Sequence, residues 1–303
     1  MNAAEAQHTR GLEELRARDA DRFGGKSASL GELLHAGIPV PPGFAISTEA
    51  GASLTEILRR DIAARYDALG EDVPVAVRSS ALGEDSAEAT FAGLQDTYLW
   101  VRRIDAVCDA VTRCWASLHS TEAVSYRERF GVENPAMGVT IQLMVDAAVS
   151  GVMFTCNPVS GDRSMVAINA SWGLGLAVVG GEVTPDDYLV SKVTGEVVRQ
   201  TINDKAVEYI PADDGAQRVD VDETRRTQPC LDDAALSSLV QVAKRIEKHF
   251  GAPQDIEWAF DQDGELFVLQ SRPVTGLPKP ETTPAPTVSS AMSMIFNKFG
   301  ATG

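Results

Sequence analysis

Hydrophobic and polar residues alternate in two short runs near the end of the chain, residues 254–260 and 266–273. The residues between them are acidic or polar and include a glycine, which favours a tight reversal of the backbone. This pattern predicts a β-hairpin. In such a hairpin four polar residues can be brought close together: Asp255, Glu257, Gln270 and Arg272.

These four side chains suit a magnesium–polyphosphate ligand. Carboxylate and amide oxygens are hard ligands of the kind that Mg²⁺ prefers, and a planar guanidinium binds phosphate oxygens. The polar face of a solvated sheet would carry the same residues, and a motif this short does not separate the two interpretations.

The remaining pattern predicts both strands and helices. The middle of the chain is rich in strand-like runs, and two segments have apolar residues at helical spacing. The expected strands are residues 138–145, 151–155 and 165–170 and a hairpin over 188–192 and 196–199; the expected helices are residues 104–118 and 232–250, the second ended by Gly251.

Composition limits the class of protein. At 303 residues with 44% hydrophobic residues the chain can bury a full core. A net charge of −16 argues against a nonspecific nucleic-acid binder, which needs a basic surface. Any polyphosphate site must therefore be a local basic pocket. The four cysteines form no C-x-x-C pair, and neither a signal peptide nor a membrane span is indicated, so a cytoplasmic protein is expected.

Two basic residues stand in informative places. Lys26 follows two glycines at the start of a predicted helix, where backbone N–H groups attract anions, although a plain turn and helix cap explains the same residues. Arg78 ends an apolar strand, where burial is costly unless an anion or an internal carboxylate meets it. The small and polar residues of segment 83–95 predict a loop that is flexible enough to close over a ligand.

Six sequence blocks stand in an order that is informative as a set. They are Gly-Gly-Lys-Ser-Ala-Ser-Leu-Gly-Glu-Leu, Gly-Ile-Pro-Val-Pro-Pro-Gly-Phe, Val-Arg-Ser-Ser-Ala with Phe-Ala-Gly-Leu-Gln-Asp-Thr-Tyr-Leu, Ser-Gly-Val-Met-Phe-Thr-Cys-Asn-Pro, Gly-Gly-Glu-Val-Thr-Pro-Asp, and Asp-Ile-Glu-Trp with Leu-Gln-Ser-Arg-Pro. Together they resemble the ATP-binding domain of the dikinase family, which includes phosphoenolpyruvate synthase, pyruvate phosphate dikinase, rifampin phosphotransferase and phenylphosphate synthase. The resemblance runs from about residue 23 to residue 275 and implies an α+β ATP-grasp fold, in which two lobes hold ATP between them.

The resemblance also implies roles for individual residues. It places Lys26, Arg78 and Arg272 on the triphosphate, and Glu257 and Gln270 on Mg²⁺ with Asp255 nearby. The other implied contacts are Gln142 and Met144 at adenine, Thr155 near phosphate, Glu182 near ribose, and Phe91, Ala92 and Gly93 in a lid over the phosphates.

In this family a histidine on a separate swivelling domain attacks the β-phosphate, so that AMP leaves. The histidines of this chain are His8, His35, His119 and His249, and none stands in a motif of that kind. We therefore expect residues 1–276 to be the nucleotide-binding domain, and the phosphohistidine and the acceptor site to lie on a separate subunit or domain. Residues 277–303 are expected to be a Pro-rich linker followed by a short Met- and Phe-rich helix that docks on that partner.

Several alternatives stay open. Phenylphosphate synthase-like enzymes, which phosphorylate phenols, resemble this organisation most, whereas a fragment of a pyruvate or water dikinase would have the same sequence features. An ATP-grasp ligase would use the same lobes but form ADP. A nucleotide-binding subunit without catalytic activity is the third class.

Overall fold

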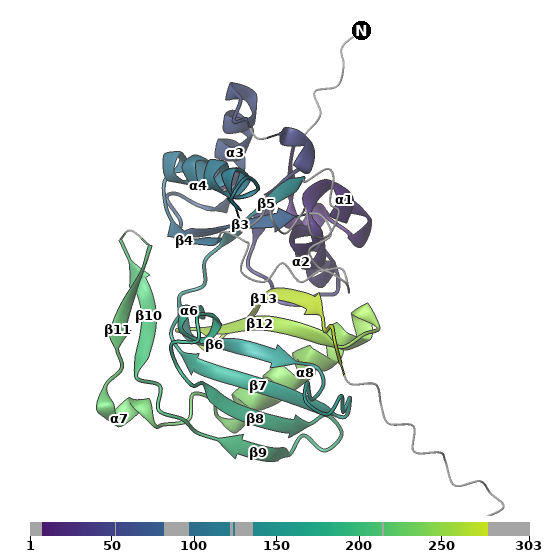
Figure 1. Cartoon of the computed structure of the whole chain (residues 1–303), viewed down its shortest axis with the longest axis vertical. Helices are drawn as coiled ribbons and strands as arrows, with labels where there is room; N and C mark the ends of the chain where they lie inside the picture. Colours follow the sequence, from purple (N-terminus) through teal and green to yellow (C-terminus); the bar gives the residue numbers. More distant parts are fainter. Residues whose placement is uncertain are drawn as a thin grey trace, which may run out of the picture.

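The computed structural model describes residues 8–51, 53–81, 97–121, 124, 136–213 and 215–277. These residues form two lobes, each built on its own β-sheet, stacked one above the other (Figure 1). The proposed lid residues Phe91, Ala92 and Gly93 and the segment 278–303 lie outside the described residues. No helix among the described residues is long and apolar enough to cross a membrane.

The N-terminal lobe contains a five-stranded sheet in the order β1-β2-β5-β3-β4, with helices packed on it. All of its neighbouring strands are antiparallel. The strands are β1 (Thr9–Gly11), β2 (Gly43–Ile46), β3 (Val75–Ala81), β4 (Thr97–Val101) and β5 (Met137–Leu143), and the α-helices are α1 (Ala20–Phe23), α2 (Gly25–His35), α3 (Glu56–Leu69) and α4 (Ile104–Ser117).

The C-terminal lobe contains a six-stranded antiparallel sheet in the order β13-β12-β6-β7-β8-β9, and a separate hairpin, β10-β11, stands beside it. The strands are β6 (Ala147–Phe154), β7 (Met165–Trp172), β8 (Asp186–Ser191), β9 (Val197–Thr201), β10 (Val207–Ala212), β11 (Gly215–Asp220), β12 (Gln254–Asp261) and β13 (Leu266–Pro273), and the α-helices are α6 (Leu176–Val179), α7 (Glu223–Arg226) and α8 (Asp233–Phe250).

Helix α8 covers one face of the six-stranded sheet (Figure 1). Its apolar stripe, which includes Leu239, Ala243 and Ile246, packs against buried residues of the sheet such as Ile256 and Trp258. The helix begins with the Asp232 carboxylate accepting a hydrogen bond from the Ala235 N–H group and ends at Gly251 in the left-handed conformation. The expected helix over residues 232–250 is therefore confirmed.

The two lobes are joined by the chain and by packing. Residues 144–146 connect β5 to β6, and the Met144 N–H group donates to the Pro74 carbonyl at 2.9 Å. Helix α2 lies against β13, where the Ser29 hydroxyl donates to the Ser271 carbonyl at 2.8 Å. Because α2 also shares one hydrophobic cluster with the C-terminal sheet, the lobes have a continuous core on this side.

A fully buried ion pair holds the start of β8. The Lys205 ammonium lies 2.7 Å from the Asp186 carboxylate, and neither side chain is exposed to solvent. The same carboxylate accepts hydrogen bonds from the N–H groups of Asn203 and Cys230. Each polar group at this position therefore has a partner within the fold.

Replacing Lys205 with methionine is expected to lower the free energy of unfolding by about 3–5 kcal/mol, because it leaves the Asp186 carboxylate buried without its counter-ion. Arg226→Met is the matched control, since it removes the exposed pair with Asp204, 2.5 Å apart. Exposed pairs contribute about 0–1 kcal/mol. Denaturant unfolding measures both variants, and equal losses would contradict the importance of the buried pair.

Candidate functional site

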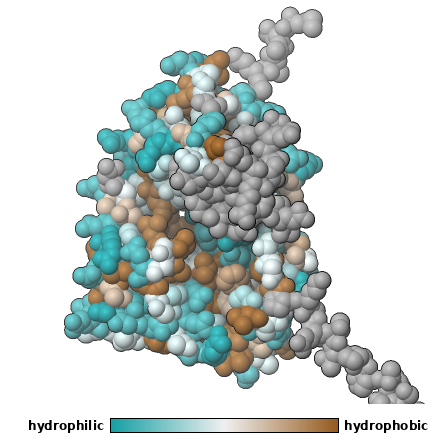
Figure 2. Space-filling model, in the orientation of Figure 1, coloured by the Kyte–Doolittle hydropathy of each residue, from teal (hydrophilic) through white to brown (hydrophobic). Residues whose placement is uncertain are grey.

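A cavity of about 720 Å³ lies between the two lobes. Strands β3, β4 and β5 supply its N-terminal wall, and β6, β12, β13 and α6 supply its C-terminal wall. Figure 2 shows hydrophobic side chains gathered at the level where the lobes meet. The lining is unevenly distributed, because the charged residues are concentrated at β3, β12 and β13, while α6 and the connection between the lobes are apolar.

The charged end of the cavity is built on the β12–β13 hairpin. In its register Glu257 is the partner of Gln270, and Asp255 is the partner of Arg272. Side chains at alternate positions of a strand share a face, so these four residues lie on one face of the hairpin. The hairpin brings the four residues together, as the sequence pattern predicted, and all four line the cavity.

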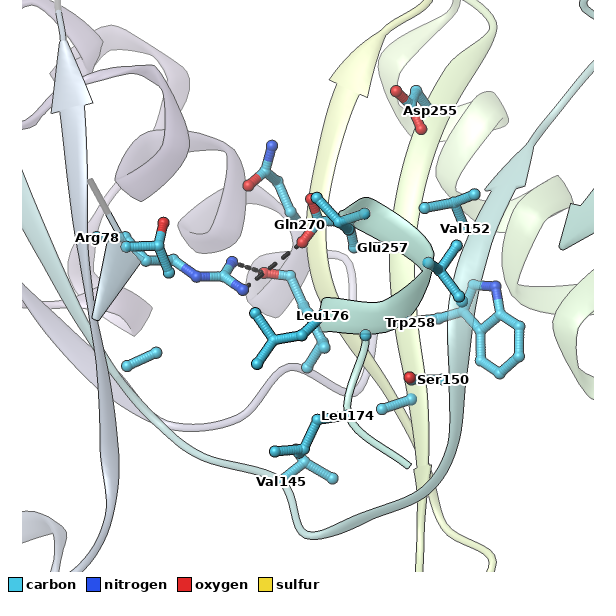
Figure 3. Close-up of a pocket in the computed structure, with 18 of the residues that line it drawn as sticks. Arg78, Val145, Ser150, Val152, Leu174, Leu176, Asp255, Glu257, Trp258 and Gln270 are labelled. Carbon is cyan, nitrogen blue, oxygen red and sulfur yellow. Dashed lines mark hydrogen bonds and ion pairs between the residues drawn. The ribbon is translucent and has the colours of Figure 1, made fainter. Parts of the chain in front are cut away.

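Arg78 reaches across from the opposite lobe (Figure 3). One of its guanidinium nitrogens donates to the Leu269 carbonyl at 3.1 Å, and the other lies 3.6 Å from a carboxylate oxygen of Glu257. The Arg78 Nε atom is buried and has no hydrogen-bond partner among the described residues. A buried N–H group without a partner is costly, so this end of the cavity suits an anionic ligand.

Arg272 and Asp255 form a closer pair. The Arg272 Nε–H group donates to the Asp255 carboxylate at 2.9 Å. Burial raises the pKa of the Asp255 carboxyl above its usual range, and Glu257 acts in the same direction, while Arg272 opposes them. The Asp255 side chain is the more buried of the pair, and the Arg272 side chain is the more exposed.

Lys26, in the first turn of α2, lines the same cavity as Arg78 and Arg272. Its ammonium donates to the Ser79 carbonyl at 3.0 Å, and its main-chain N–H group donates to the Ser80 hydroxyl at 3.2 Å. Both acceptors directly follow Arg78 on β3. The approach requires Gly24, whose φ is +83°, because a Cβ atom there would lie 2.4 Å from the Ser80 carbonyl oxygen. The Gly-Gly-Lys segment thus brings Lys26 beside Arg78.

The other end of the cavity suits an apolar ring. Gln142 and Met144 line it where β5 passes into the connection between the lobes. The amide of Gln142 is buried and donates to the Pro41 carbonyl at 3.3 Å. Apolar side chains complete this end, among them Val145, Ala147, Leu174 and Leu176.

Two residues named from the resemblance do not line the cavity. Thr155 is fully buried beyond the end of β6, where its hydroxyl accepts a hydrogen bond from the Gln254 N–H group at 2.9 Å. Glu182 lies after α6 and binds the Tyr209 hydroxyl at 2.7 Å and Arg218 at 3.2 Å. Their contacts with a nucleotide therefore stay predictions, as do those of the lid residues.

The residues present fit a magnesium ion that is shared with a ligand. Among the described residues no group of three or more His, Cys, Asp or Glu side chains could hold a metal by itself. Glu257 and Gln270 do offer two oxygen ligands side by side. Mg²⁺ is usually bound by one or two carboxylates together with substrate phosphates, so this pair is sufficient when a polyphosphate is present.

Several lining residues were not singled out from the sequence. Ser150, Val152 and Phe154 occupy alternate positions of β6 and face the cavity. The period of two in this strand could have indicated that they share a face, but only the sheet order shows which face meets the other lobe.

Two mixed lobes of helix and sheet, with a cavity between them that carries charged and apolar residues, form the fold class expected from the sequence, that of an ATP-grasp domain. The family model "Pyruvate phosphate dikinase, AMP/ATP-binding domain" matches residues 20–57 and 50–292. The chain therefore belongs to the pyruvate phosphate dikinase AMP/ATP-binding domain family. This confirms the expected family and fold class.

Curated relatives agree with this assignment. A "Probable phosphoenolpyruvate synthase" of Methanothermobacter thermautotrophicus is 39% identical over 314 residues, covering 88% of this chain and 46% of that protein. A "Rifampicin phosphotransferase" of a Streptomyces species is 39% identical over 316 residues, covering 89% of this chain and 36% of that protein. The chain thus spans less than half the length of these relatives.

Among solved structures, the D-alanine–D-alanine ligase from Coxiella burnetii is similar with a TM-score of 0.37 and 11% identity, covering 82% of this chain and 47% of that chain. A similarity of this size carries no conclusion about activity.

Proposed function

We propose that residues 1–276 bind ATP with Mg²⁺ in the cavity between the lobes and present the β-phosphate to a histidine on another subunit or domain. Attack on the β-phosphate releases AMP and leaves the β- and γ-phosphates on the histidine. Water then removes the γ-phosphate as free phosphate, and the β-phosphoryl group passes to an acceptor, for which we propose a phenol or another aromatic alcohol. The observation that carries this proposal is the convergence of Lys26, Arg78 and Arg272 on Glu257 and Gln270 at one end of the cavity.

The side chains have complementary tasks in phosphoryl transfer. Charge spreads over the phosphate oxygens during the transfer, and fixed cations placed beforehand stabilise that charge. Arg78 and Lys26 approach from one lobe and Arg272 from the other, so closing the lobes around ATP brings the three cations onto the phosphates. Bound Mg²⁺ supplies further neutralisation of the phosphate charge and needs the oxygens of Glu257 and Gln270.

The proposed source of the nucleophile is a partner. All four histidines are described, and none is among the described residues that line the cavity. His249 pairs with Glu32 at 3.1 Å, and His8 lies 3.3 Å from the Ser47 hydroxyl. Residues 277–303 are the proposed linker and docking segment. The relatives are longer than this chain, which agrees with further domains being needed for the whole reaction.

Product analysis tests the proposed reaction. The chain is mixed with ATP, Mg²⁺ and each candidate partner protein that carries a Ser-His motif, and the adenine nucleotides are separated. We expect AMP and an acid-labile phosphohistidine on the partner. ADP formed without AMP would contradict the dikinase assignment and favour a ligase.

A further inference from the structure

One wall of the apolar part of the cavity is a segment whose local structure is not stable by itself. Residues 173–182 carry Leu174, Leu176, Val178 and Val179 into the cavity lining, yet their only helix, α6, is a single turn of four residues. Helices this short are not stable without outside contacts. The position of this wall must therefore be set by other residues.

Tyr209 on β10 contacts both ends of the wall, and at the first end β6 adds the Ala148 carbonyl and the Ser150 hydroxyl, which bind Gly173. At the first end the Leu174 N–H group donates to the Tyr209 carbonyl at 2.8 Å, and Gly173 forms a parallel bridge with the same residue. The contact is so close that a Cβ atom on Gly173, whose φ is +70°, would lie 2.4 Å from that carbonyl oxygen. At the second end the Tyr209 hydroxyl donates to the Glu182 carboxylate at 2.7 Å.

The second contact joins the Tyr209 hydroxyl to an exposed carboxylate. The hydrogen bond from Tyr209 lowers the pKa of the Glu182 carboxyl, and that from Arg218 acts in the same direction. Arg218 is the partner of Tyr209 in the β10–β11 register, so the hairpin presents both donors together. Tyr209 itself packs against the cluster of Trp100, Ala147, Leu174 and Ala259, which contains residues of both lobes.

We propose that Tyr209 is a positioning residue for the nucleobase end of the cavity, holding the wall of residues 173–182 in the shape that accepts the base. This inference rests on the proposed ATP binding. Tyr209 does not line the cavity, and its hydrogen bonds are made with Leu174 and Glu182 and not with Arg78, Glu257 or Gln270. Loss of its hydroxyl should therefore weaken binding of the base and leave the phosphate contacts intact.

The test compares two ligands with wild-type protein and Tyr209→Phe. We expect the Kd of ATP, and its KM with a partner, to rise about 5-fold, because a hydrogen bond to a charged group is lost. The Kd of inorganic tripolyphosphate with Mg²⁺, which has no base, should stay within about twofold, as should kcat, since the phosphate contacts are unchanged. Tyr66→Phe is the matched control. It removes a hydroxyl that donates to the Val73 carbonyl at 2.7 Å, and both of these residues lie in the N-terminal lobe.

The binding measurements distinguish failure of the proposed role of Tyr209 from failure of the proposed ATP binding. Equal weakening of ATP and tripolyphosphate, or an ATP affinity equal to that of Tyr66→Phe, would overturn the role of Tyr209 while leaving the proposed function in place. Failure of the wild-type protein to bind ATP at all would overturn the proposed function and this inference with it.

Discussion

Replacing Arg78 with alanine is expected to lower AMP formation by the assembled enzyme about 10²–10³-fold, the loss typical of removing one fixed donor to a developing charge. The Arg78 side chain is only 12% exposed and is the group of the N-terminal lobe that reaches Glu257 in the other lobe. Loss of the Arg78 side chain removes a cation from the phosphates. It also removes the contact with Glu257 that links the two lobes beside the ligand.

The matched control for Arg78 is Arg199→Ala. Arg199 forms an exposed pair with Asp187 on the far edge of the C-terminal sheet, 2.9 Å apart and away from the described cavity lining. Its loss should change AMP formation less than twofold, because exposed pairs contribute about 0–1 kcal/mol and this one touches no ligand. If Arg78→Ala retained full activity with the partner, the chain would instead be a subunit without a catalytic role.

Replacing Glu257 with glutamine is expected to lower kcat about 10²-fold and to raise the Mg²⁺ concentration required for half-maximal activity. The substitution keeps the size of the side chain but removes the one carboxylate that stands beside Gln270 in the hairpin register. Glu265→Gln, in the turn of the same hairpin and exposed, is the control. Initial rates measured across a series of Mg²⁺ concentrations distinguish the two variants, and an unchanged requirement in Glu257→Gln would exclude Glu257 as a metal ligand.

The β12–β13 hairpin shows how much of the site the sequence could predict. Alternating residues around a glycine turn predicted a hairpin that can bring Asp255, Glu257, Gln270 and Arg272 close together. The structure contains this hairpin and adds its register, in which Asp255 pairs with Arg272 and Glu257 with Gln270. The strand that carries Arg78 and the helix that has Lys26 in its first turn were likewise predicted from local pattern, although β3 continues past Arg78 to Ala81. Each of these features depends on neighbouring residues only.

The contacts between distant segments could not be predicted in this way. The sequence left open whether Arg78 meets an internal carboxylate or an anion, and the structure places it 3.6 Å from Glu257 of the other lobe. The β10–β11 hairpin was missed because few of its residues are buried and they show no strong alternation. The contact between Tyr209 of this hairpin and residues 173–182 could not be predicted either, because it depends on how distant segments of the chain fold together.

The measurement that tests the central claim most directly uses ATP labelled at a known phosphate. The chain, Mg²⁺ and a partner protein that carries the histidine are incubated with ATP labelled at the β-phosphate and, separately, at the γ-phosphate. Our account predicts that the β-label appears on the histidine of the partner and the γ-label appears as free phosphate. Transfer of the γ-label to the histidine with formation of ADP, or no transfer of either label, would contradict it.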